Sequence, residues 1–287
     1  MKDVKLDGLS REDWLKIRRS GVGGSDVAGI MKMSPFATPL DVYLDKIGES
    51  KPIEENARMI AGRFLEPAVA NMFADMFTDY KLVKDTHMRF HKDYPYMFAN
   101  TDYLIKAPDG SYGVLEIKTT NSWYAKTWTD DVPAQYYLQL MYYIGIMDFQ
   151  FGYIAILIDG WDFRCYRYER NNNDIQSIFF NVMKFWNDNV IAKVEPEPMS
   201  DEDLKTLYPE TVSGKCVEAD VLVRADCNEY LEVLEEESVL KSKKSKLAFD
   251  IKRVMGDAEL LIDGDEIIAK LKQNAKGARV LTVVKQN

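Results

Sequence analysis

The chain has 287 residues, 46% hydrophobic and 12% aromatic, which is enough for a sizeable core in one large domain or in one domain with an appendage. It holds no run of about 18 apolar residues, so a transmembrane helix is not expected, and its charged start, MKDVKLDGLSREDW, lacks the apolar stretch of a secretory signal. The net charge of −9 argues against a nucleic-acid partner when taken alone, but residues 241–287 hold 11 bases and 6 acids, a local net charge of +5.

Two helices are predicted near the N-terminus. Residues 10–20 predict a short helix with Ser10 as its N-cap and basic residues in its last turn. The glycine-rich stretch GVGGSDVAGIM, residues 21–31, then leads into a second helix, with Ser25 near its start. A hydroxyl therefore lies beside a glycine-rich turn, soon after a basic helix end.

Two further helices are predicted before the first strand. TPLDVYLDKIG predicts a helix between a Thr38 cap and a Gly48 stop, with proline at the first helical position. Residues 53–78 also have helical periodicity, but they contain Pro67. A proline inside a helix removes a hydrogen bond, so we expect a kink, or a new helix beginning just at Glu66.

The middle of the chain alternates between strand and helix patterns. We expect strands at about 81–91, 97–105 and 112–119, with the turn residues APDG between the last two. PAQYYLQLMYYIGI predicts a helix, and FGYIAILIDGWDFRCYRYER predicts two strands joined by a tight turn at Asp159-Gly160. Residues 174–191 are helical again. This order favours an α/β or α+β core, a sheet flanked by helices.

The end of the chain has a different character. A proline-containing connector leads into a charged helical region, and short strands follow with a turn at Asp263-Gly264. We therefore divide the chain into a core, residues 1–200, and a C-terminal helix and β-hairpin appendage, residues 201–287. The charge run EEESVLKSKK in this appendage fits a solvated helix face.

The stretch NTDYLIKAPDGSYGVLEIKTT places two carboxylates and a lysine on adjacent strands. Glu116 and Lys118 point to the same face of their strand, and Asp102 lies in front of the predicted hairpin, across the turn from them. Carboxylates suit Mg²⁺ or Mn²⁺, with the Ile117 carbonyl available as a third ligand and Glu66 as an additional one. Taken alone, this triple is weak, because a surface salt bridge beside a turn also explains it; its charges, however, lie in an apolar strand, where an unpaired charge is costly.

These residues resemble the signature of PD-(D/E)XK nucleases, with Thr101 in place of the usual proline. More of the chain resembles one branch, the lambda-exonuclease and YqaJ-type viral recombinases. GRFLEP resembles that family's acidic helix and maps its additional acidic residue onto Glu66. AQYYLQLMYYIG resembles its glutamine helix and maps the active-site glutamine onto Gln139, with Tyr143 one turn later.

The N-terminal block WLKIRRSGVGGSD resembles the segment with which this family meets a DNA end. The matching positions are Trp14, Arg18 and Ser25, and the resemblance implies that they bind DNA. Arg18 can hold a terminal 5′-phosphate with two donors, and Ser25 adds a hydroxyl. Trp14 is as readily explained by core packing as by stacking on bases.

The resemblance implies a restriction-endonuclease-like mixed sheet flanked by helices. It also implies a Mg²⁺-dependent 5′-to-3′ exodeoxyribonuclease that digests one strand of linear double-stranded DNA and leaves 3′ single strands for phage-type recombination. The catalytic residues would be Glu66, Asp102, Glu116, Lys118 and Gln139. The implied partners are DNA ends, a single-strand annealing protein and further copies of the chain in a ring-like trimer, in the cytoplasm of a bacterial host.

Two alternatives remain open at the sequence level. One is another nuclease of the superfamily, Cas4-like or endonucleolytic, although a Cas4-like iron–sulfur cluster needs four cysteines and this chain has three, Cys165, Cys216 and Cys227. The other is a non-catalytic module that binds DNA ends. With only two histidines, His87 and His91, the chain offers little for a histidine-centred zinc site.

Overall fold

The computed structural model describes residues 3–50, 54–128 and 131–285. The chain divides into two units, Met1–Thr211 and Val212–Asn287. The division falls eleven residues after the boundary drawn from the sequence, because α7 (Asp201–Leu207) is tied to the first unit. Its buried Asp203 accepts a hydrogen bond from the Thr38 hydroxyl at 2.9 Å.

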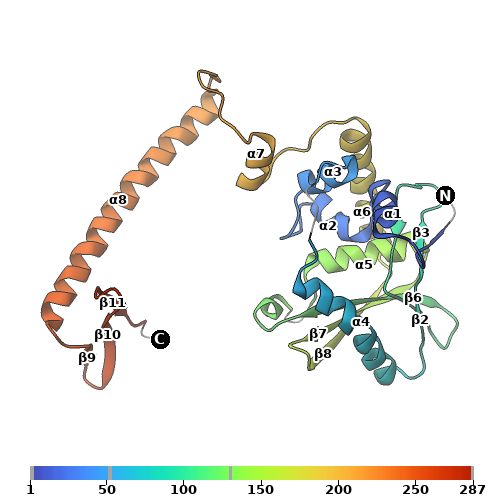
Figure 1. The fold of residues 1–287 in the computed structure, drawn as a ribbon, viewed down its shortest axis with the longest axis horizontal. Coiled ribbons are helices and arrows are strands. Elements are labelled where there is room, and N and C mark those ends of the chain that lie inside the picture. The colour runs from blue at the N-terminus through green and yellow to red at the C-terminus, as the bar shows by residue number, and fades with distance from the viewer. Residues whose placement is uncertain (1–2, 51–53, 129–130, 286–287) are drawn as a thin grey trace. The chain divides into compact units, whose positions relative to one another are not determined.

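The first unit is built around a five-stranded sheet in the order β2-β5-β6-β7-β8 (Figure 1). Its strands are β2 (Lys81–Lys84), β5 (Tyr103–Lys106), β6 (Tyr112–Thr120), β7 (Phe151–Ile158) and β8 (Asp162–Glu169). β6 and β7 pair in parallel and the other neighbours pair antiparallel, so the sheet is mixed. The predicted central mixed sheet flanked by helices is therefore confirmed.

Helices cover both faces of this sheet. On one face α5 (Ala134–Met147) packs on the strands, with α2 (Gly24–Ile30) and α6 (Asn172–Phe185) against it in the largest apolar cluster. On the other face α4 (Ala57–Met76) contributes Val69 and Phe73 to a second cluster (Figure 1). Because strand residues alternate between faces, β6 sends Val114 toward the α5 side and Leu115 and Ile117 toward the α4 side.

The N-terminal helices form as their caps predict. α1 (Arg11–Arg19) begins after Ser10, whose hydroxyl accepts from the Asp13 amide, and α3 (Pro39–Ile47) begins after Thr38 and ends at Gly48, where φ is +83°. A small sheet in the order β1-β3-β4 lies among these elements. Its strands are β1 (Val4–Lys5), β3 (His87–Phe90) and β4 (Phe98–Ala99). Two short elements complete the unit: η1 (Tyr124–Thr127) and η2 (Trp186–Ile191), the latter a π-helical continuation of α6.

Two sequence predictions differ from the structure. The runs 81–91 and 97–105 each split between two sheets, at Asp85–Thr86 and around Asp102. Asp85 is buried and accepts hydrogen bonds from the Thr101 hydroxyl and the Arg89 guanidinium, which fixes the chain at the first break. α4 runs through Pro67 as a single helix, so the expected new helix at Glu66 is wrong.

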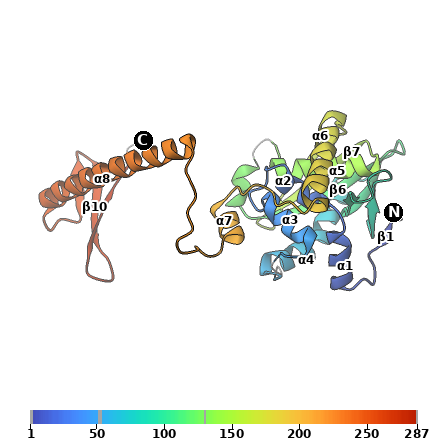
Figure 2. The same ribbon diagram turned by 90° about the horizontal axis from the view of Figure 1, so that it is seen from above.

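The second unit combines one long helix with a small sheet. α8 spans Val221–Met255, and the sheet has the order β11-β10-β9, with β9 (Leu260–Asp263), β10 (Glu266–Gln273) and β11 (Arg279–Val283). The last turns of α8 pack on this sheet, where Met255 meets Ala269 and Leu271 (Figure 2). Within the described residues, no helix has the length and apolar content needed to cross a membrane.

Candidate active site

The first acidic residue completes the hydrogen bonding of β6. β5 and β6 pair only as far as Tyr103 opposite Leu115. Beyond that point β6 has a strand neighbour on the β7 side only. The Asp102 carboxylate takes over, and its Oδ2 accepts from the Ile117 amide at 2.8 Å. Because the N–H and C=O of one strand residue point to the same side, the Ile117 carbonyl also points toward Asp102.

The second acidic residue lies on the same strand and is almost fully buried. Glu116 is 4% exposed, and its Oε1 accepts hydrogen bonds from Lys118 Nζ and Gln139 Nε2, each at 2.7 Å. Its Oε2 has no hydrogen-bond partner among the described residues, although it is buried. A buried carboxylate oxygen without a partner is costly, so this atom is suited to a ligand from outside the described residues.

Lys118 and Gln139 form the other side of the site. Lys118 Nζ donates to Gln139 Oε1 at 3.2 Å and lies 5.0 Å from the centre of the Tyr136 ring. Gln139 is held in turn by the Tyr143 hydroxyl, which lies 3.1 Å from its Nε2. Burial alone would lower the pKa of Lys118, but the carboxylates of Glu116 and Asp102 outweigh it and raise that pKa, so the side chain stays an ammonium at neutral pH.

The two carboxylates repel each other strongly. Burial, and then the charge of Glu116, raise the pKa of Asp102 to about 8, against an ordinary value near 4. A pair of carboxylates with such mutual repulsion and an unpartnered oxygen fits a divalent cation, which would remove the repulsion and supply the missing partner. Asp102, Glu116 and the Ile117 carbonyl are the groups that fit it.

The third expected acid has another partner. Glu66 lies on α4 and makes an ion pair with Lys84 of β2. It is close enough to Asp102 to add to the rise in that residue's pKa. Among the residues that the structure describes, however, no three acidic, histidine or cysteine side chains converge as a metal cluster. The structure therefore brings Asp102 and Glu116 together. Glu66 lies near them but is paired with Lys84.

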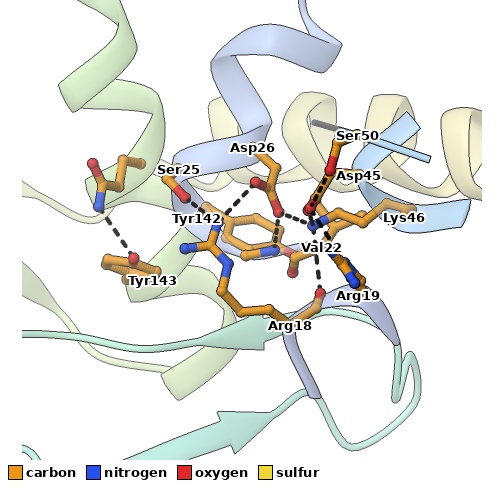
Figure 3. A network of polar contacts seen from close by, with 12 residues as sticks. Arg18, Arg19, Val22, Ser25, Asp26, Asp45, Lys46, Ser50, Tyr142 and Tyr143 are labelled. Atoms are coloured by element: carbon orange, nitrogen blue, oxygen red, sulfur yellow. Dashed lines mark hydrogen bonds and ion pairs between the residues drawn. The ribbon is translucent and has the colours of Figure 1, made fainter. Parts of the chain in front are cut away.

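Two of the residues expected to meet the DNA end, Arg18 and Ser25, belong to a second polar group (Figure 3). Arg18 Nη2 donates to the Ser25 hydroxyl at 2.9 Å and to Asp26 Oδ1 at 3.1 Å. The guanidinium carbon also lies 5.1 Å from the centre of the Trp14 ring. Trp14 is half-buried and packs with Ile17 on a small apolar cluster of the N-terminal sheet, whereas Ser25 is exposed.

The two polar groups are joined through α2. A Cβ built on Gly24 would lie 2.4 Å from Cε1 of Tyr143, so the first turn of α2 packs directly on that ring. Tyr143 in turn bonds Gln139, which contacts both Glu116 and Lys118. α2 therefore links the Arg18–Ser25 group to the side chains around Glu116.

Comparison with known proteins gives the family. Residues 13–150 match the model of the YqaJ-like viral recombinase domain. Over 265 residues the chain is 33% identical to the uncharacterized protein YqaJ of Bacillus subtilis (strain 168), covering 89% of this chain and 82% of that protein. The chain belongs to the YqaJ-like viral recombinase family. The family expected from the sequence motifs is confirmed.

Solved structures share the fold of this YqaJ-family protein. The alkaline exonuclease LHK-Exo from Laribacter hongkongensis is similar with a TM-score of 0.53 and 23% identity, covering 63% of this chain and 93% of that one. The same enzyme solved with dAMP gives the same TM-score and identity, covering 68% and 97%. This chain therefore shares its mixed α/β fold with that alkaline exonuclease.

Two further residues of the Arg18 group, Asp26 and Lys46, were not expected from the sequence (Figure 3). The Lys46 side chain is fully buried, and its Nζ lies 2.6 Å from Asp26 Oδ2, which also accepts from the Gly23 amide at 2.9 Å. Burial alone would raise the pKa of Asp26, but the cations of Lys46 and Arg18 outweigh it and lower that pKa. Asp26 therefore stays a carboxylate that fixes Arg18 on one side.

A signal for this pair was present in the sequence. Lys46 lies four residues after Val42 and three after Tyr43, both of which are buried, so it falls on the apolar face of α3. A lysine there must find a buried anion. Asp26 is the third residue after Gly23, the position of a capping acid.

Proposed function

We propose that this protein is a metal-dependent 5′-to-3′ exodeoxyribonuclease that acts on linear double-stranded DNA and leaves 3′ single strands for recombination. The observation that carries the proposal is the buried Glu116 carboxylate, with one oxygen held by Lys118 and Gln139 and the other without a partner, beside Asp102. Membership of a viral recombinase family supports the same function.

The groups that would hold Mg²⁺, or Mn²⁺ in its place, are Asp102, Glu116 and the Ile117 carbonyl. When bound, the cation would offset negative charge on the reacting phosphate and acidify a water molecule. Lys118 would donate a hydrogen bond to the phosphate oxygen on which negative charge develops, since its ammonium persists at neutral pH. Gln139 keeps that donor in position, because it bonds both Lys118 and Glu116 while Tyr143 holds it from behind.

The direction of digestion rests on Arg18 and Ser25. Ser25 is exposed and lies within hydrogen-bond distance of the Arg18 guanidinium, so a terminal 5′-phosphate can contact both. The Gly23 amide is already bonded to Asp26, so the side chains carry this role. Trp14 places its ring beside Arg18, where it can stack on an unpaired base while its inner edge stays in the apolar cluster.

The alternatives and partners are proposals of different weight. The three cysteines do not favour a Cas4-like cluster, because such a cluster needs four cysteine ligands. A non-catalytic DNA-end-binding module would not need a lysine held between Glu116 and Gln139. A single-strand annealing protein and a ring-like trimer of this chain stay predictions.

The test uses linear duplex DNA labelled at either the 5′ or the 3′ end. The wild type should release the 5′ label as mononucleotides in Mg²⁺ and neither label in EDTA. Glu116→Gln and Asp102→Asn should lose cleavage by at least a hundredfold, whereas Glu169→Gln, an exposed acid of the same sheet, should keep it. Wild-type rates in both acidic variants, or equal release of both labels, would show that the assignment is wrong.

End recognition is tested by comparing 5′-phosphorylated with 5′-hydroxyl duplex. A charge-assisted contact contributes roughly 1.5–3 kcal/mol, about a ten- to hundredfold preference for the phosphorylated end. Arg18→Ala should shrink that preference, while Arg19→Ala should keep it, because Arg19 faces Asp45 on α3 instead of Ser25. An unchanged preference in Arg18→Ala would leave Arg18 with a structural role only.

A further inference from the structure

The long helix α8 exposes a regular apolar stripe. Val233, Leu240, Leu247 and Val254 recur every seventh residue, and each shows between 53% and 72% of its surface to solvent. A seven-residue apolar repeat is the pattern of helices that pack along one another. The sheet of the second unit packs on the last turns of the helix, through Ile251 and Met255, and leaves these four residues exposed. Within the described part of the second unit, nothing covers the stripe along about three heptads.

Two charged residues interrupt the second line of the same repeat. The positions three residues before each stripe residue are Tyr230, Glu237, Lys244 and Ile251. An apolar partner along this line would bury Glu237 and Lys244 without compensation, which is costly. A partner that carries opposite charges at matching places would compensate both, and charged residues at such positions select the alignment of paired helices.

The charges outside the stripe divide α8 into two halves. Residues 226–237 hold six acids and no base, and residues 241–253 hold six bases and one acid. The acidic half disfavours DNA or an anionic membrane along the whole helix. A parallel copy would place like charges side by side over both halves. An antiparallel copy places the acidic half of each helix against the basic half of the other.

We propose that α8 docks a second copy of this chain, with the two α8 helices packed antiparallel through Val233, Leu240 and Leu247 and crossing near residue 241. Such a pairing is two-fold symmetric, so each copy uses the same patch. Crossing there brings Glu237 of each copy within reach of Lys244 of the other. This contact lies within the second unit and does not depend on the nuclease proposal.

A charge swap in the full-length chain tests the pairing. The mass of the wild type in solution, by light scattering, should exceed that of Glu237→Lys by a factor of two or more. The double variant Glu237→Lys, Lys244→Glu should restore the wild-type mass, because the pair is re-formed with reversed signs. Glu235→Lys is the matched control, since it lies on the opposite side of the helix from the stripe and should change nothing.

Cysteine cross-linking separates the antiparallel from the parallel arrangement. In a full-length Cys165→Ala, Cys216→Ser background, Cys227 lies 14 residues from the crossing point, so two antiparallel copies hold it about 40 Å apart at 1.5 Å per residue. Adding Cys227→Ser and Leu240→Cys moves the only thiol close to the crossing. Oxidation should give a disulfide dimer with Leu240→Cys and none with Cys227. Dimers through Cys227, or none through Leu240→Cys, would overturn the proposal, as would a mass that Glu237→Lys leaves unchanged.

Discussion

Replacing Lys46 by methionine should destabilise the first unit strongly. The Lys46 side chain is fully buried, and its ammonium contacts Asp26 Oδ2 at 2.6 Å, Asp45 Oδ2 at 3.2 Å and the Arg18 carbonyl at 3.4 Å. Breaking a buried ion pair costs about 3–5 kcal/mol because the remaining charge stays buried. Since Arg18 still faces Asp26 in the variant, we expect the lower end, about 3 kcal/mol, or a fall in Tm of about 6–12 °C.

Tryptophan fluorescence provides an assay that reports on this unit alone. All five tryptophans lie between Trp14 and Trp186, so unfolding of residues 212–287 does not contribute to the signal. Lys16→Met is the matched control, because Lys16 forms an exposed pair with Glu12 and should change stability by less than about 0.5 kcal/mol.

A double-variant cycle with Asp26→Asn then tests whether the charge pair is the cause. The double variant should lose less free energy of unfolding than the sum of the losses in the two single variants. With both residues neutral, neither position 26 nor position 46 keeps a buried charge that has lost its partner. If Lys46→Met were as stable as wild type, or the two losses simply added, the reasoning from burial and pairing would be refuted.

Three further predictions follow from the same geometry. The pKa of Asp26 is lowered in the folded state, so its ionised form stabilises the fold. This contribution is full above the unfolded pKa of about 3.9 and is lost as the pH falls through the folded pKa. Between about pH 5 and pH 2 the Tm of the wild type should therefore fall more than the Tm of Asp26→Asn. Gly24→Ala should cost about 1–3 kcal/mol in urea unfolding by pressing on the buried Tyr143 ring, whereas Gly62→Ala, whose Cβ would meet nothing closer than 3.5 Å, should be neutral or stabilising; equal effects would contradict this packing. Added Mg²⁺ should raise the Tm of wild type and not that of Glu116→Gln, and an equal rise in both would remove Glu116 from the cation site.

Local patterns predicted the parts of the fold that depend on near neighbours. The caps at Ser10 and Thr38 act within one helical turn, and the turn at Asp159-Gly160 gives positive φ at both residues, as its sequence requires. Strand alternation placed Glu116 and Lys118 on one face, where the structure joins them at 2.7 Å. These features follow from backbone geometry alone.

Features that depend on contacts between residues far apart in the sequence could not be predicted from local sequence patterns. The strand run at 81–91 breaks because Asp85 is buried against Thr101, which is 16 residues away. The Asp26–Lys46 pair joins two helices, and neither helix alone shows which acid meets the lysine. Gln139 came from the family resemblance, since nothing in its helix distinguishes a glutamine that faces the sheet from one that faces solvent.

The hydrogen bond from the Ile117 amide to Asp102 has a consequence for how position 102 can change over evolutionary time. One carboxylate would serve both the proposed cation site and the part of β6 that extends past β5, so a relative that abandoned catalysis would still need an acceptor there. Asparagine meets that need and alanine does not, because alanine leaves a strand amide without its partner. Selection for folding alone would therefore keep position 102 polar. In a distant relative, a polar residue at position 102 is consequently weaker evidence of nuclease activity than an acidic residue at position 116.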